Sequence, residues 1–324
     1  MVLLKQTDYV FSSAYLRAIE NRLLTKNDFE SLILASDFTA AAKSLRDKGF
    51  SDSEITPENL DLVLQNRLNS CRQEAIWSSP DENVLDIFSY KNDFHNLKAV
   101  IKALSTKKTD YERFFLKPCT IDPEIFVKAV ANIDFSILPD GFKSCAEEAF
   151  YAHNKYENPA LAECIIDKAC MDYMMDAAKE TKNEFLSGLV KLENTLSDIK
   201  IAARCAFCGK DRAFTEKILS DDSGIDRDEL ILASVSGKVS EYLKEKGMDE
   251  AAKSINSGLG EFEKYADNKI SEYIEGSSQI TFGVETVIAY IYRVEAEIRT
   301  IRVILNAKNN KIPETEIRKR IRNL

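Results

Sequence analysis

Cysteine and histidine are the residues of this chain whose types could carry catalysis or bind a metal. Cys205 and Cys208 are separated by two residues, a spacing found in metal sites and in thiol–disulfide sites. No second close cysteine pair is present, and the pair lies inside a helical pattern, whereas a thioredoxin-type site needs it after a strand, where a helix begins. His95 and His153 lack a second ligand at the spacing of a helical zinc motif. The pattern favours buried thiols and structural or solvated histidines.

Motifs that would bind a phosphate or calcium are also not indicated. Gly258-Leu-Gly260 resembles the opening of a dinucleotide-binding loop, but Glu263 occupies the third glycine position and no strand precedes the segment. Counting back from Gly224 places Leu219 at the first ligand position of an EF-hand loop. Neither Gly-x-x-x-x-Gly-Lys-Ser/Thr nor Gly-x-Ser-x-Gly occurs. We therefore predict no catalytic residue, no metal site and no cofactor, and the chain is not expected to be an enzyme.

Composition indicates helices and an acidic surface. The 324 residues are 44% hydrophobic and 30% charged, and only 11 Gly and 7 Pro are present to punctuate sheets and long loops. A net charge of −9 disfavours general binding to nucleic acid or anionic lipid. Residues 293–324 depart from this, because they contain nine Lys/Arg against four Glu. The C-terminal helices are predicted to form the basic end of an acidic protein.

Location can also be predicted from the sequence. The longest stretch without Asp, Glu, Lys or Arg covers only the nine residues 276–284, whereas a spanning helix needs roughly 20 apolar residues. The N-terminus lacks the basic segment, apolar run and cleavage site of a secretion signal. The seven cysteines show no dense disulfide framework. We expect a cytoplasmic protein with reduced thiols and no membrane span.

Four helical segments align with one another and share one apolar seam. Leu16, Leu97, Ile199 and Ile298 begin the seam, and it continues two turns later at Leu23, Leu104, Ala206 and Leu305. The three later copies, 96–104, 198–206 and 297–305, also share a polar or acidic residue, then Leu or Ile, then Lys or Arg. The first copy, 15–23, keeps only the Leu-Arg half. This recurrence predicts a repeated helical unit with a period near 100 residues.

A second element follows the first three copies. It begins at Asp28, Asp122 and Asp226, where an Asp side chain can accept from the free N–H groups of a first helical turn. It ends at Gly49, Gly141 and Gly247, each followed by an apolar residue, which is typical of a left-handed glycine cap. We predict three helical repeats within residues 1–85 together with 287–324, 86–187 and 188–286. The terminal pieces would close a ring if they pack together.

The order of these motifs resembles the C subunit of V-type and archaeal-type rotary ATPases, whose eukaryotic relative is called the d subunit. The resemblance covers essentially the whole chain and rests on three parallel stretches and two terminal ones. These are Phe94-His-Asn-Leu-Lys98, Leu196-Ser-Asp-Ile-Lys200, Glu295-Ala-Glu-Ile-Arg299, Ala18-Ile-Glu-Asn-Arg-Leu-Leu24 and Ile312-Pro-Glu-Thr-Glu-Ile-Arg-Lys-Arg320.

The resemblance implies an all-α fold in which three pseudo-threefold-related helical subdomains form a funnel-shaped socket. It also implies a non-catalytic central-stalk subunit that links the stalk to the membrane proteolipid ring (c/K) and transmits torque for ATP synthesis or hydrolysis coupled to ion transport. The implied partners are that ring and central-stalk subunits D and F. The implied location is peripheral, on the cytoplasmic face of the membrane.

Six basic residues are candidates for partner binding. Three follow the seam and three lie near the C-terminus: Lys98, Lys200, Arg299, Arg318, Lys319 and Arg320. The first three could line a central cavity and meet acidic stalk residues, or each could be a solvated charge paired with a residue beside it or a turn away. An alternative function is a helical adaptor that docks partners through its basic C-terminal helices, and nucleic-acid binding through that end is a weaker alternative.

Overall fold

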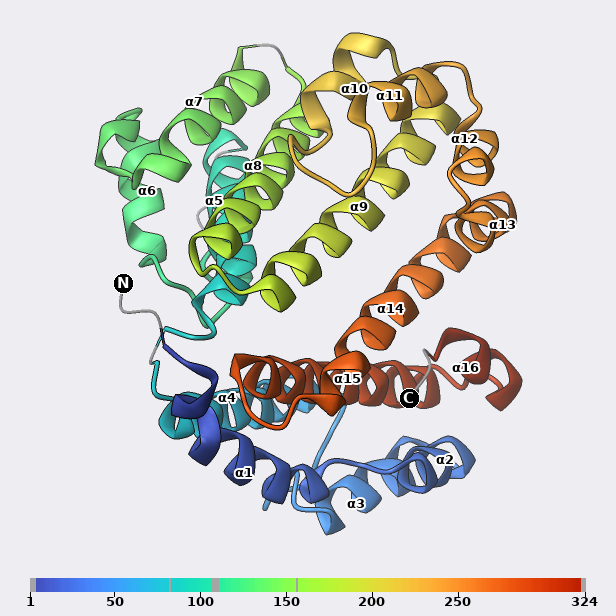
Figure 1. Cartoon of the computed structure of the whole chain (residues 1–324). Coiled ribbons are helices and arrows are strands. Elements are labelled where there is room, and N and C mark those ends of the chain that lie inside the picture. Colours follow the sequence, from blue (N-terminus) through green and yellow to red (C-terminus); the bar gives the residue numbers. More distant parts are fainter. Residues whose placement is uncertain (1–3, 82, 107–110, 156, 322–324) are drawn as a thin grey trace. The chain divides into compact units, whose positions relative to one another are not determined.

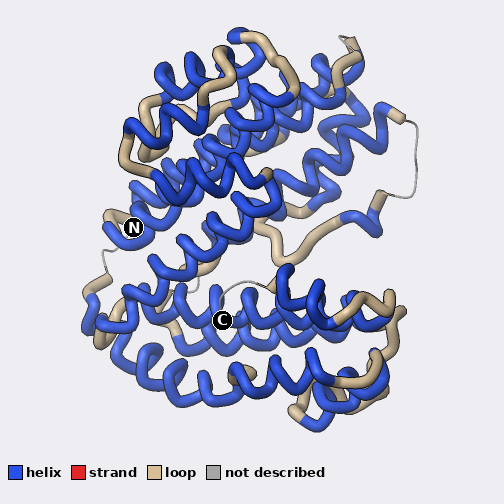
Figure 2. Tube along the Cα trace, turned by 90° about the vertical axis from the view of Figure 1, so that its right-hand side faces the viewer, coloured by secondary structure: helices blue, strands red, loops and turns tan. Residues whose placement is uncertain are grey.

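In the computed structural model, which describes residues 4–81, 83–106, 111–155 and 157–321, every regular element is a helix and no strand occurs among these residues (Figures 1 and 2). The all-α prediction is confirmed. The chain divides into two compact units, one formed by residues 1–84 and 267–324 and the other by residues 85–266.

Unit 1 combines the two ends of the chain. Its helices are α1 (Val10–Ile19), α2 (Lys26–Leu34), α3 (Phe38–Asp47), α4 (Leu60–Ser78), α15 (Val284–Asn309) and α16 (Glu314–Arg320), with short 3₁₀ turns η1 (Gln6–Tyr9), η2 (Glu20–Arg22) and η5 (Ser277–Gln279). Helix α15 is the central element, because α1, α2, α3, α4 and α16 all pack against it. The consecutive residues 287–291 are all buried, so burial extends around several sides of this helix. The N-terminal and C-terminal helices therefore share one core.

Unit 2 is built on three long helices. These are α5 (Asp86–Ser105), α8 (Pro159–Glu180) and α9 (Glu184–Phe207), and the shorter ones are α6 (Pro123–Asn132), α7 (Asp140–Asn154), α10 (Arg212–Ile218), α11 (Arg227–Val235), α12 (Val239–Glu245), α13 (Asp249–Ser257), η3 (Glu112–Phe114) and η4 (Phe135–Ile137). Helix α14 (Leu259–Gly276) contributes residues to both units. The core includes stacked rings of Phe94 and Phe142, whose centroids are 4.2 Å apart.

The seam residues are buried where the repeat begins. Leu16, Leu97, Ile199 and Ile298 are at most 4% exposed, as the seam alignment predicts. The first copy differs from the others, because α1 ends at Ile19 and the chain continues as the 3₁₀ turn η2. Leu23 therefore lies beyond the helix. The prediction that the seam continues for two helical turns is therefore wrong for the first copy.

A buried polar residue beside the seam ties each later seam helix to a loop. Asn96 on α5 exchanges two hydrogen bonds with the backbone of Leu116, at 2.7 and 3.0 Å. Asp198 on α9 accepts from the N–H and the hydroxyl of Ser220, at 3.0 and 2.5 Å. These bonds satisfy polar groups that would otherwise be costly to bury. The recurrent polar residue of the sequence motif therefore holds the connection that follows the helix.

The third of these polar residues shows how the N-terminal repeat is completed. Glu297 on α15 accepts from the backbone N–H of Leu24, at 2.6 Å, just before α2. Lys308, also on α15, donates to the carbonyl of Ala35 after α2. The helix pair α2 and α3 thus packs on α15, in the way that α6 packs on α5 and α11 on α9. The sequence alignment instead associates this pair with the helix that contains Leu16.

The predicted helix starts hold at two of three positions. Asp122 caps α6, with Pro123 as its first residue, and Asp226 caps α11. Asp28 is not a cap, because Thr25 caps α2 and Asp28 is the third residue of a capping box. A hydrogen bond from Lys48 and further bonds from Thr25 lower the pKa of Asp28 to about 2.

The predicted glycine caps also hold at two of three positions. Gly49 and Gly247 have φ of 82° and 74°, and the following N–H groups bond back to Leu45 and Leu243 across the cap. Gly141 is wrong as a cap, because it lies in the first turn of α7, and Ile133 takes the left-handed position at the end of α6. A Cβ atom on Gly141 would lie 2.2 Å from the ring of Tyr173. Close packing therefore explains this glycine.

Replacing Gly49 by valine is expected to lower the free energy of unfolding by at least about 1 kcal/mol, because a β-branched residue is strained at a positive φ. Denaturant unfolding measures this change. Gly260→Ala is the control, since Gly260 lies in α14 with open space around its Cβ position. It should be neutral or stabilising by up to about 1 kcal/mol. Equal losses in both variants would contradict the cap assignment.

Candidate functional site

The three cations beside the seam are each paired with a carboxylate on another helix. The pairs are Lys98–Asp167 at 2.5 Å, Lys200–Glu263 at 3.5 Å and Arg299–Asp267 at 3.4 Å. The carboxylate partners come from α8 and α14. The alternative that each cation pairs with a residue beside it or a turn away on its own helix is therefore wrong. The cation side chains remain 23%, 36% and 50% exposed, in the same order. Each position therefore presents a partly exposed charge whose field is reduced by its neighbour.

The basic residues of α16 make different contacts from one another. Both terminal nitrogens of Arg318 bond to the carboxylate of Glu30 on α2, at 2.7 and 2.8 Å, and Arg318 also bonds to Glu314. These acidic partners raise the pKa of the Arg318 guanidinium. Lys319 pairs with Glu316 at 2.7 Å and is 70% exposed. Arg318 thus holds α16 against α2, while Lys319 and Arg320 lie on the exposed side.

The residues with catalytic potential are dispersed. Within the described ranges, no group of three His, Cys, Asp or Glu side chains is arranged to hold a metal ion. Cys205 and Cys208 are free thiols, of which Cys208 is exposed and Cys205 is buried, and burial raises the pKa of Cys205. A ring nitrogen of His95 lies 3.2 Å from the carbonyl oxygen of Phe114. The structure thus places these residues in separate local environments.

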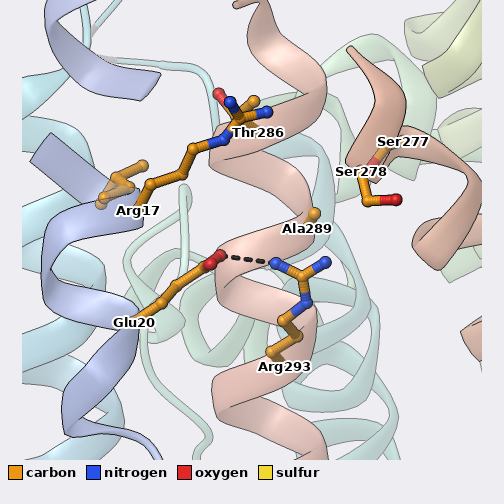
Figure 3. Close-up of a pocket in the computed structure, with 8 residues that line it drawn as sticks. Arg17, Glu20, Ser277, Ser278, Thr286, Ala289 and Arg293 are labelled. Atoms are coloured by element: carbon orange, nitrogen blue, oxygen red, sulfur yellow. Dashed lines mark hydrogen bonds and ion pairs between the residues drawn. The ribbon is translucent and has the colours of Figure 1, made fainter. Parts of the chain in front are cut away.

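A pocket of about 290 Å³ opens in unit 1 between α1, η2, η5 and α15 (Figure 3). Six of its eight lining residues are of polar or charged type, and the full set is Leu16, Arg17, Glu20, Ser277, Ser278, Thr286, Ala289 and Arg293. This pocket was not predicted from the sequence, because its residues come from segments more than 250 positions apart and have the ordinary types of helix surfaces. The one signal in the sequence was Arg17, the basic residue of the incomplete first repeat.

Charges within the pocket are unevenly compensated. Arg293 bonds to Glu20 at 2.5 Å, the contact drawn in Figure 3, and to Glu275 at 3.2 Å. Arg17 donates one hydrogen bond to the carbonyl of Ile280, at 2.5 Å. Within the described part of the chain, Arg17 has no carboxylate at ion-pair distance. Of the two guanidinium groups at the pocket wall, only that of Arg293 is thus neutralised by the described residues.

Comparison with known proteins places this architecture in a family. The family model described as ATP synthase (C/AC39) subunit matches residues 12–320. The chain is similar to the C subunit of the V-type sodium ATPase of Enterococcus hirae, with 20% identity over 322 residues that cover 95% of this chain and 96% of that protein. None of the described helices is both long and apolar enough to cross a bilayer. Because the family model covers nearly the whole sequence, the chain belongs to the C/AC39 subunit family of V/A-type ATPases.

Proposed function

We propose that this protein is a non-catalytic central-stalk subunit of a V/A-type rotary ATPase. It links the rotating stalk to the proteolipid ring in the membrane and transmits torque between ATP chemistry and ion translocation. The observation that carries the proposal is the family match over residues 12–320. The sodium ATPase C subunit from Enterococcus hirae, similar over 95% of the chain, supports it.

The internal ties between helices and loops suit a part that must transmit force. Seam helices α5, α9 and α15 are each tied to a distant loop through a buried polar side chain, at Asn96, Asp198 and Glu297. Buried hydrogen bonds of this kind resist sliding of one element past another, because displacement would leave polar groups unsatisfied. Such ties support a torque-bearing role for each unit.

The proposed partners are the proteolipid ring and stalk subunits D and F, with the protein held at the cytoplasmic face of the membrane. Lys98, Lys200 and Arg299 are proposed to meet acidic stalk residues, and Lys319 and Arg320 to contact a partner from α16. Arg318 is a weaker candidate, since Glu30 and Glu314 already engage it. The same engagement weakens the alternative of an adaptor that docks through a free basic C-terminal face.

Isolation of the chain from native membranes tests the proposal directly. An affinity-tagged full-length chain should bring down a proteolipid ring together with stalk subunits, identified by mass spectrometry. A variant lacking α15 and α16 serves as the control, because unit 1 loses its central helix without them. Recovery of the intact chain with neither ring nor stalk subunits would refute the proposed role.

The purified chain is expected to hydrolyse no ATP and to bind no nucleotide tightly. The physical reason is that the sequence contains no phosphate-binding loop of the Gly-x-x-x-x-Gly-Lys-Ser/Thr type to hold the phosphates. Calorimetric titration with Mg-ATP and a phosphate-release assay measure the two quantities. Saturable ATP binding at micromolar concentrations would contradict the non-catalytic assignment.

A further inference from the structure

The unit 1 pocket has the size of a small binding site. Its volume of about 290 Å³ is near the lower end of the range of roughly 300–1,000 Å³ found for ligand pockets. This size favours a small ligand over an extended one. The walls come from α1, η2, η5 and α15, so an occupant would touch parts of the chain that are distant in sequence.

Some hydrogen-bond donors in the pocket already have a partner within the protein, and others do not. The Thr286 hydroxyl lies 2.7 Å from that of Ser13 and donates to the Gly283 carbonyl, and Ser277 donates to Ile274. The exposed Ser278 hydroxyl has no hydrogen-bond partner within the described residues. Arg17 directs one N–H to the carbonyl of Ile280 and retains its other donors. The available hydrogen-bonding capacity is therefore concentrated at Arg17 and Ser278.

The charge balance selects the sign of the ligand. Among the described lining residues, Glu20 is the only acidic one, and its carboxylate is bound to Arg293. Arg293 is bonded to both Glu20 and Glu275, so among the lining residues the charge without a described carboxylate partner is that of Arg17. A guanidinium offers two parallel N–H donors that match the oxygens of a carboxylate or a phosphate. A cation would meet a carboxylate that is already neutralised and a guanidinium that repels it.

We infer that this pocket is a binding site for a small oxyanion, a carboxylate or a phosphate, held by the guanidinium of Arg17 and the hydroxyl of Ser278. The bound anion supplies the counter-charge that the described residues do not provide to Arg17. It also connects α1 to the segment around η5, because Arg17 lies on α1 and Ser278 on η5. Binding to the folded state alone stabilises that state by mass action.

Thermal unfolding and isothermal calorimetry of the isolated full-length chain test the inference with inorganic phosphate and with succinate. Ionic strength is held constant with sodium chloride, so that general screening is the same in every sample. At least one anion should raise the unfolding midpoint with a saturable dose dependence. Saturation by phosphate identifies the site as one for phosphates, and saturation by succinate identifies it as one for carboxylates. The absence of saturable binding of either anion would overturn the inference.

Arginine substitutions locate the binding. Arg17→Gln should weaken the affinity at least about tenfold, since it removes a charge-assisted contact. The matched control is Arg22→Gln, because Arg22 is on the following turn, pairs with Glu74 at 3.1 Å and does not line the pocket. Arg17→Lys, which keeps the charge without the two-pronged geometry, should bind with intermediate affinity.

Two further checks separate binding from folding. Ser278→Ala should weaken the affinity severalfold without altering the circular dichroism spectrum, since the Ser278 side chain is exposed and its hydroxyl makes no hydrogen bond to the described residues. An equal dose response in wild type and in folded Arg17→Gln would refute the site. The experiment needs no ring or stalk subunit, so its outcome is independent of the proposed role in the ATPase.

Discussion

Replacing Asp198 by alanine should lower the free energy of unfolding by about 3 kcal/mol, measured by denaturant titration. Asp198 is 1% exposed and accepts from both the N–H and the hydroxyl of Ser220. Truncation leaves these donors buried without a partner and opens the tie between α9 and the loop before α11. Asp226→Ala is the control, because this exposed aspartate caps one helix and should contribute only about 1 kcal/mol.

The pH dependence of an asparagine variant provides a second readout at the same position. Burial raises the pKa of Asp198 above its usual value, so the folded state takes up a proton more readily than the unfolded state. The favourable contribution of the protonated carboxyl is present at low pH and is lost as the pH rises through the folded pKa. The stability of wild type relative to Asp198→Asn should therefore decline as the pH rises from about 4 towards neutrality. A pH-independent difference would contradict the buried-carboxyl interpretation.

Neutralising the three seam cations is expected to weaken association with the stalk subunits at least about tenfold at low salt. The variant is Lys98→Gln, Lys200→Gln and Arg299→Gln, and binding is measured by surface plasmon resonance at two salt concentrations. Folding should survive, because exposed ion pairs usually contribute less than about 1 kcal/mol each. The expected loss follows from the proposal that these charges steer an acidic stalk foot.

The carboxylates paired with these cations give a matched control for this prediction. Asp167→Asn, Glu263→Gln and Asp267→Asn remove the same ion pairs but leave the cations in place. If the cations contact the stalk directly, this second triple variant should bind more tightly than wild type. If the ion pairs matter only for the internal structure, both triple variants should change binding in the same direction. The second result would direct attention to Lys319 and Arg320 on α16 as the stalk contact.

Local chemistry explains which parts of the fold could be predicted. The caps at Asp122, Asp226, Gly49 and Gly247 follow from interactions within a few residues, and each is found where the sequence pattern places it. Gly141 is also followed by an apolar residue, but it does not cap a helix. A glycine is needed there because the ring of Tyr173 from α8 leaves no room for a Cβ atom. A contact between residues distant in sequence cannot be read from a local motif.

The polar motif beside the seam could be found in the sequence, but its structural role could not. The recurrence of a polar residue at Asn96, Asp198 and Glu297 is visible in the sequence, yet a polar residue next to a cation suggests a solvated pair. All three are buried, and their partners are loop backbones. The burial of these residues depends on a loop whose course the sequence does not indicate.

The pocket was beyond prediction for a related reason. Arg17 and Ser278 line one pocket only because α1 and η5 both pack on α15, which lies near the other end of the chain from α1. Arg17 is marked only as the basic residue of the incomplete first repeat, and Ser278 belongs to no motif. The family resemblance, by contrast, could be recognised from ordered short motifs along the whole chain.

The composition of unit 1 from both chain ends has a consequence for biosynthesis. Helices α1 to α4 leave the ribosome early, but α15, against which they pack, is completed only at Asn309. At about 5–20 residues per second, this helix follows roughly ten to fifty seconds later. During that interval the apolar faces of the early helices lack their native cover, whereas residues 85–266 can already fold. We therefore expect chaperones to engage the nascent N-terminal segment rather than residues 85–266 during synthesis.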